Sequence, residues 1–192
     1  MRHNYGYVNP SDVSRRLEKI FNDIYSAEVL NLDNLKNEFY NVAMKISKLP
    51  KRHQDEVVSS IWNKILKTKF TVKECTDFSK WDNRKMLRNA IALALYSILE
   101  GLRTNQLRKF IDMSTAIHRK MKLGKIRDDE IEASILKMRY LLAYQAGKQK
   151  SVEKLALVLD LMLQKTTKDN FERFYEFLQA VVAYHKFFGG AD

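Results

Sequence analysis

The scarcity of chain-breaking residues is the feature that most constrains this sequence, since only 6 glycines and 2 prolines are distributed over 192 residues. A sheet-rich fold of this length needs many tight turns, and glycine and proline supply a large share of them. Helices joined by short polar loops need far fewer. Because 45% of the residues are hydrophobic, the chain can also form a core. The sequence therefore predicts an all-α protein.

Apolar residues recur at helical spacing through the first part of the chain, where they predict about three helices. The first helix starts at Pro10 and Ser11, and the third starts at Pro50, because proline fits the first turn of a helix. Residues 70–81 are polar and aperiodic, so we expect a linker there. The three apolar stripes are formed by Val13, Leu17, Ile20, Phe21 and Ile24; by Leu32, Leu35, Phe39, Val42 and Ile46; and by Val57, Val58, Ile61, Ile65 and Leu66.

The second part of the chain predicts a bundle of about five helices. Residues 1–80 are thus expected to form an N-terminal helical extension, and residues 81–192 the bundle. Residues 83–100 are apolar on nearly every side, which is typical of a central, buried helix. The five helices are expected to start at Asn83, at Thr104 as a cap, at Asp128, near Ser151 and at Asp169.

The last predicted helix carries apolar or aromatic side chains on more than one face. Two interpretations remain open: these faces fill the core of this chain, or part of them packs against another chain. One face consists of Phe171, Phe174, Leu178 and Val182, and the other of Phe177, Ala180, Tyr184 and Phe188.

Several functional classes lack the residues they require. Cys75 is the only cysteine, and the four histidines show no metal-ligand spacing. We expect His118 to be a hydrogen-bonded core residue and His185 to sit as a cation near a helix end. No phosphate-binding glycine loop or nucleophile motif occurs, so no enzyme activity, metal or cofactor is expected. Without a signal-peptide core or a run of about 20 apolar residues, a cytoplasmic location is expected.

The positive charge is concentrated in one segment. The chain has a net charge of +11, and between Arg103 and Arg127 there are eight basic side chains and one acidic side chain, Asp112. Charge gathered in this way favours a polyanion partner, whereas the alternative is an ordinary solvated helix face. The candidate phosphate-binding residues of this segment are Arg108, Lys109, Arg119, Lys120, Lys122, Lys125 and Arg127.

A second candidate face lies on the helix that follows. Lys137, Tyr140, Tyr144 and Lys148 share one side of that helix. Basic groups interleaved with aromatic rings can hold a single strand of nucleic acid by charge and stacking. The alternative, which we favour here, is that the tyrosines pack at the edge of the core with their hydroxyls in water.

Three stretches resemble, in order and spacing, the small subunit of the type III-A (Csm) CRISPR effector complex. The resemblance covers about residues 86–190, and residues 1–80 have no recognised counterpart. The stretches are TNQLRKF at 104–110, MRYLLAYQAG at 138–147, and the segment 174–190 that ends AVVAYHKFFGG.

The resemblance implies a non-catalytic, RNA-binding helical bundle in an antiviral ribonucleoprotein. Its partners would be the crRNA and target RNA, the Csm backbone and large subunits, and neighbouring copies of itself, with no membrane. By position, the first stretch carries over Arg108 and Lys109, and the second carries over Arg139. The other basic candidates rest on charge alone.

Three other functions remain as alternatives. A helical DNA-binding or regulatory protein would prefer duplex DNA, although no helix-turn-helix spacing is evident. A helical nuclease would cleave RNA as a pure protein. A purely structural protein-binding bundle would need the basic segment to be inert.

Overall fold

A computed structural model describes residues 8–191, which are largely helical and contain no strand. The all-α prediction is confirmed. The chain divides into two compact units between Thr68 and Lys69. In the part that the structure describes, no helix is long and apolar enough to cross a membrane.

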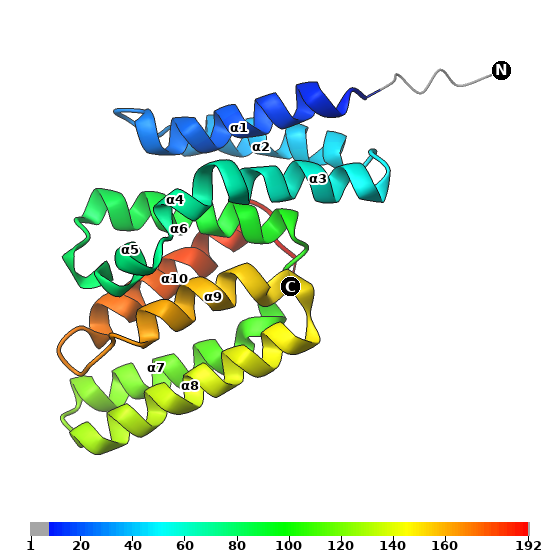
Figure 1. The fold of residues 1–192 in the computed structure, drawn as a ribbon. Helices are drawn as coiled ribbons and strands as arrows, with labels where there is room; N and C mark the ends of the chain where they lie inside the picture. Colours follow the sequence, from blue (N-terminus) through cyan, green and yellow to red (C-terminus); the bar gives the residue numbers. More distant parts are fainter. Residues whose placement is uncertain (1–7, 192) are drawn as a thin grey trace. The chain divides into compact units, whose positions relative to one another are not determined.

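The first unit is built on three helices, α1 (Pro10–Ser26), α2 (Leu32–Ile46) and α3 (Lys51–Ile61), of which α1 packs against both others (Figure 1). Side chains just before α1 and α2 cap them: the Asn9 carboxamide accepts from the Ser11 amide at 2.9 Å, and Asn31 accepts from the Asn34 amide at 3.0 Å. After α3 the chain continues through a π-helical stretch, η1 (Trp62–Leu66), and the short α4 (Lys67–Lys69).

The predicted apolar stripes form the core of the first unit. Leu32 is the exception, because it is the first residue of α2 and is only partly buried. The buried residues are Val13, Leu17, Ile20, Phe21, Ile24, Leu35, Phe39, Val42, Ile46, Val57, Val58, Ile61, Ile65 and Leu66.

The second unit has five longer helices: α6 (Asn83–Leu99), α7 (Arg108–Lys122), α8 (Asp128–Lys148), α9 (Glu153–Leu163) and α10 (Phe171–Phe187). It is centred on α6, whose residues 89–97 are all buried, as expected of a central helix. α10 packs against α6 and α7, and α8 contacts both α7 and α9 (Figure 1).

The aromatic faces of α10 fill the core of this chain. Phe171, Phe174 and Phe177 are fully buried, and Phe174 meets the ring of Phe110 edge-on, with 6.3 Å between ring centres. Of the two interpretations, a well-filled core describes most of this helix. Val182 and Tyr184 remain partly exposed.

The expected linker at residues 70–81 is wrong. It forms α5 (Val72–Thr76), which packs on α9, and a 3₁₀ turn, η2 (Phe78–Lys80), which packs on α10. Cys75 and Phe78 are buried. The sequence pattern predicted a linker because each of these helices is too short to show a 3.6-residue period of apolar residues.

Thr104 does not cap α7. It begins a 3₁₀ turn, η3 (Thr104–Leu107), and α7 starts only at Arg108. Its hydroxyl instead lies 3.3 Å from Nδ1 of His185, and Nε2 of His185 lies 3.1 Å from the Leu102 carbonyl oxygen. His185 thus lies in the last turn of α10, as expected, and is a buried, hydrogen-bonded residue there.

The backbone at Gly190 packs closely against the His185 ring. Gly189 has φ +88°, a conformation that favours glycine, and the Gly190 amide donates to the His185 carbonyl at 2.8 Å. A Cβ at Gly190 would lie only 2.1 Å from Cε1 of His185. The Ala191 carbonyl then accepts from the Thr104 amide at 2.9 Å, which joins the first family-like stretch to the residue that follows the third.

His118 lies where α7 meets α10. Its ring stacks on that of Tyr175, with centres 4.1 Å apart, and its Nε2 lies 3.8 Å from a carboxylate oxygen of Glu172. It is partly exposed rather than a full core residue.

Candidate nucleic-acid interface

The basic segment is displayed along α7 because the opposite side of that helix is buried. Phe110, Ser114 and Ile117 face the core, so the basic residues on the remaining sides of the helix point to solvent. α7 and α8 lie side by side (Figure 1). Both candidate faces of the sequence are therefore on neighbouring helices.

Most of the predicted cations are exposed and unpaired. They form no ion pair with any residue between 8 and 191. We call this set, together with Tyr140 and Tyr144, the α7–α8 face. Its cations are Arg108, Lys109, Arg119, Lys120, Lys125, Lys137 and Lys148.

Two further predicted cations are exposed but paired. The Lys122 ammonium lies 2.6 Å from Glu172, and Arg127 contacts Asp129 at 3.1 Å and Glu130 at 3.3 Å. Hydrogen bonding by Lys122 lowers the pKa of Glu172. Exposed pairs of this kind contribute little to stability and exchange readily with other ions.

Arg139 has an internal contact. Its guanidinium donates to both carboxylate oxygens of Asp160, at 2.7 and 3.4 Å, and so joins α8 to α9. Both side chains are about one-third exposed. Burial alone would raise the pKa of Asp160, but hydrogen bonds from Arg139 and Gln164 outweigh it and lower that pKa. Of the ten predicted RNA-binding residues, this one has the clearest structural role.

The tyrosines of α8 extend into solvent, contrary to the favoured expectation. Tyr140 is 64% exposed and Tyr144 is 57% exposed. The ammonium of Lys148 lies 4.7 Å from the centre of the Tyr144 ring. A hydrogen bond from Lys148, and the charges of Lys148 and Lys109, lower the pKa of the Tyr144 phenol.

The charge of Lys109 on α7 thus acts on Tyr144 of α8, and the two helices pack against each other. The structure thus brings the basic segment and the tyrosine-containing face together as one surface. Sequence reasoning treated them separately, because the register between two helices is set by packing and is not visible in either helix alone.

A pocket of about 630 Å³ opens at the beginning of α7. Arg108 lies at this pocket together with Asp112, the one acidic residue of the basic segment. The remaining lining residues are Thr104, Asn105, Ile111 and Val182. Thr104, Asn105 and Arg108 belong to the first family-like stretch and Val182 to the third, while Ile111 and Asp112 directly follow the first.

The chemistry available on the α7–α8 face is that of phosphate contact and base stacking. Lysine ammonium groups act as point charges, and arginine guanidinium groups fork onto phosphate oxygens. Exposed tyrosine rings stack on unpaired bases. Within residues 8–191 no cluster of three or more His, Cys, Asp or Glu side chains is arranged to hold a metal ion.

Comparisons with known proteins identify the family of this chain. The family model described as Csm2 Type III-A matches residues 80–191, which is more than half of the chain. The CRISPR system Cms protein Csm2 of Streptococcus thermophilus is 31% identical over 94 residues, which cover 47% of this chain and 76% of that protein. This chain therefore belongs to the Csm2 family, the small subunits of type III-A CRISPR complexes.

Proposed function

We propose that this subunit is non-catalytic and binds RNA through the α7–α8 face while it packs against neighbouring subunits in antiviral defence. The observation that carries the proposal is the row of exposed cations without acidic partners along α7 and α8. Such cations gain affinity for phosphates by releasing condensed counterions. The Csm2 family is generally structural, which supports a role without catalysis.

The RNA would be the crRNA and its target. In a guide-dependent effector, base pairing selects the sequence, so the protein surface needs to recognise phosphates and shape only. Lysine and arginine contacts to phosphates meet that requirement because they carry no sequence information. We infer a cytoplasmic location, where such RNA partners would be encountered.

Membership of the family makes this chain part of a multi-subunit Csm complex. We propose that it contacts the Csm backbone and large subunits and further copies of itself. Exposed apolar side chains of the second unit, Leu123 at 57%, Leu136 at 44% and Leu157 at 46%, support such contacts. RNA binding would be weak for one copy and tight when copies align, because linked contacts raise the effective concentration.

The first experiment is to purify the tagged protein from its host and to sequence the RNA that accompanies it. We expect short RNAs that share a repeat-derived end, together with Csm subunits. Random RNA without partner proteins would contradict the proposal. A preference for duplex DNA would instead support a helical DNA-binding or regulatory protein.

The second experiment tests the α7–α8 face directly. Arg119→Glu with Lys120→Glu should weaken binding to a guide–target RNA duplex by about tenfold and reduce its salt dependence. Lys122 is left intact because its pair with Glu172 joins α7 to α10. The matched control is Lys67→Glu with Lys165→Glu, which changes the net charge equally at exposed residues outside this face. Equal binding by the two variants would exclude α7 as the contact.

A further inference from the structure

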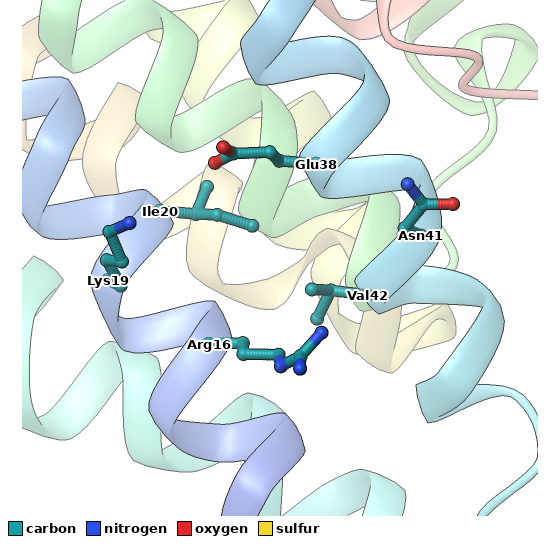
Figure 2. Close-up of a pocket in the computed structure, with 6 residues that line it drawn as sticks. All are labelled: Arg16, Lys19, Ile20, Glu38, Asn41 and Val42. Carbon is teal, nitrogen blue, oxygen red and sulfur yellow. The ribbon is translucent and has the colours of Figure 1, made fainter.

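The first unit, which lies outside the family match, has a groove of its own between α1 and α2. Figure 2 shows its central part, where Arg16 and Lys19 of α1 face Glu38 and Asn41 of α2. The floor is apolar, because Ile20, Val42 and Val13 are buried beneath it.

The groove consists of two adjoining hollows that share Arg16. One has a volume of about 270 Å³, and the other, of about 210 Å³, is lined by Asp12 and Lys45 as well. Along α1 they extend from Asp12 to Lys19, about 10 Å at the helical rise of 1.5 Å per residue. Successive phosphates of an extended single strand lie farther apart than the axial rise of about 3.4 Å in a duplex, so about two phosphates fit along this length.

Charge in the groove is unbalanced. Arg16, Lys19 and Lys45 form no ion pair with the residues that the structure describes. Asp12 is engaged by Arg15, whose guanidinium lies 2.6 Å away. Glu38 is then the one acidic group of the lining without such a partner in the described chain.

Elsewhere in the first unit, several basic side chains have acidic partners, whereas Lys48 and Lys67 form no ion pair with the described residues. Lys64 lies 2.6 Å from Glu18, and Lys51 lies 3.0 Å from Asp55. The cations of the groove differ from these scattered lysines because they lie together around adjoining hollows. Arg16, Lys19 and Lys45 line two adjoining hollows that share Arg16, and such a local excess of positive charge attracts an anion.

We propose that this groove binds the phosphodiester backbone of single-stranded RNA. Arg16 presents a guanidinium fork, and Lys19 and Lys45 supply point charges to the phosphates. The Asn41 carboxamide offers a neutral donor to phosphate or sugar oxygens. The hollows are too small for a duplex, which favours one strand.

A base-stacking residue lies beside the groove. Tyr40, next to Asn41 in α2, is 62% exposed, and Met44, one turn further, is 44% exposed. A positive groove that follows the backbone, with an exposed aromatic ring next to it, is the usual arrangement for a single strand. The choice of RNA over another polyanion rests on the proposed function, whereas the location of the site does not.

The test measures binding of the full chain to a labelled single-stranded uridine oligomer at several salt concentrations. Arg16→Glu with Lys45→Glu should weaken binding about tenfold relative to the Lys67→Glu, Lys165→Glu control. The slope of log affinity against log salt should fall by about 1.4, since each single-strand phosphate contact contributes about 0.7. Circular dichroism checks that helicity is unchanged, and Arg16→Gln with Lys45→Gln replaces the reversal if it is not.

A second variant tests the groove by a gain of affinity. Glu38→Gln removes the opposing acid and should tighten oligomer binding by about twofold to threefold. Groove variants that bind like the control, and an unaltered Glu38→Gln affinity, would overturn the proposal.

The Arg119→Glu, Lys120→Glu variant separates this proposal from the proposed function. If only that variant loses binding, the α7–α8 face is supported as the RNA-binding site and the groove is rejected. Loss in the groove variant alone supports the groove and rejects the α7–α8 face. A wild-type chain that prefers a DNA strand to the uridine oligomer would reject RNA as the ligand of both.

Discussion

At the scale of single residues, the close contact between Gly190 and His185 gives the sharpest prediction. A methyl group at Gly190 would overlap the His185 ring, which is held by Leu102 and Thr104. Gly190→Ala should therefore lower the free energy of unfolding by about 1–3 kcal/mol, the usual cost of overpacking. Urea denaturation measures the change.

Gly147→Ala is the matched control for that prediction. Gly147 lies near the end of α8, and a Cβ there would meet no atom within 4 Å. Alanine in a helix costs less backbone entropy than glycine, so this variant should be neutral or more stable by up to about 1 kcal/mol. If both variants behaved alike, steric overlap at His185 would not be the cause.

The Arg139–Asp160 pair predicts a dependence of stability on pH. Because the folded pKa of Asp160 is lowered, the pair stabilises the fold fully above the ordinary Asp pKa of about 3.9. The contribution is lost as the pH falls through the lower, folded pKa. Arg139→Gln should cost about 1 kcal/mol at neutral pH, a value kept small because both groups are one-third exposed.

The free energies of unfolding of the wild type and of Arg139→Gln should therefore become equal as the pH falls below the folded pKa of Asp160. Thermal unfolding across the acidic range measures this convergence. RNA affinity of the folded variant should change less than in Arg119→Glu, since Arg139 is held by Asp160. A large loss of affinity with unchanged stability would return Arg139 to the RNA-binding set.

At the scale of elements, the outer face of α8 predicts single-strand binding. Tyr140→Ala with Tyr144→Ala should weaken binding of a single-stranded oligomer about tenfold, because stacking contributes about 1–3 kcal/mol per base. Phenylalanine at both positions should retain most of the affinity. Fluorescence anisotropy measures both variants, and helicity should not change because both rings are exposed. Equal losses for Ala and Phe would assign the effect to the hydroxyls instead.

The sequence predicted long elements better than short ones. Stripes such as Val13, Leu17 and Ile24 repeat often enough to establish a helical period, and the structure buries them. α5 and η2 are too short to show a helical period of apolar residues, and their neighbours are polar. The burial of Cys75 and Phe78 could therefore not be predicted from the sequence. Tertiary packing, not local pattern, places them in the core.

At the scale of the whole molecule, the sequence showed where the basic side chains are concentrated, but it did not show which of them form ion pairs. The concentration of cations between Arg103 and Arg127 is visible in the sequence. Only the fold shows that Lys122 and Arg139 have acidic partners while Arg119 does not. The influence of Lys109 on Tyr144 likewise depends on how α7 packs against α8.

The boundary between the units gives a last prediction, because the sequence and the structure suggest different truncations. The predicted bundle starts at residue 81, and the second compact unit starts at Lys69. Residues between these points pack into the second unit: the Phe78 ring meets that of Phe174, with 6.5 Å between ring centres. A chain of residues 69–192 should therefore unfold at a higher temperature than one of residues 81–192.

The expected difference is large. Removing the buried Cys75 and Phe78 exposes the sides of α9 and α10 that they cover, and each large buried side chain contributes about 1.5–3 kcal/mol. Arg173, whose guanidinium donates to the Trp81 carbonyl at 2.6 Å, keeps its acceptor in both chains and so does not affect the comparison. Thermal unfolding followed by circular dichroism measures both. Equal melting temperatures would show that α5 and η2 do not stabilise the bundle, and would favour a boundary at residue 81.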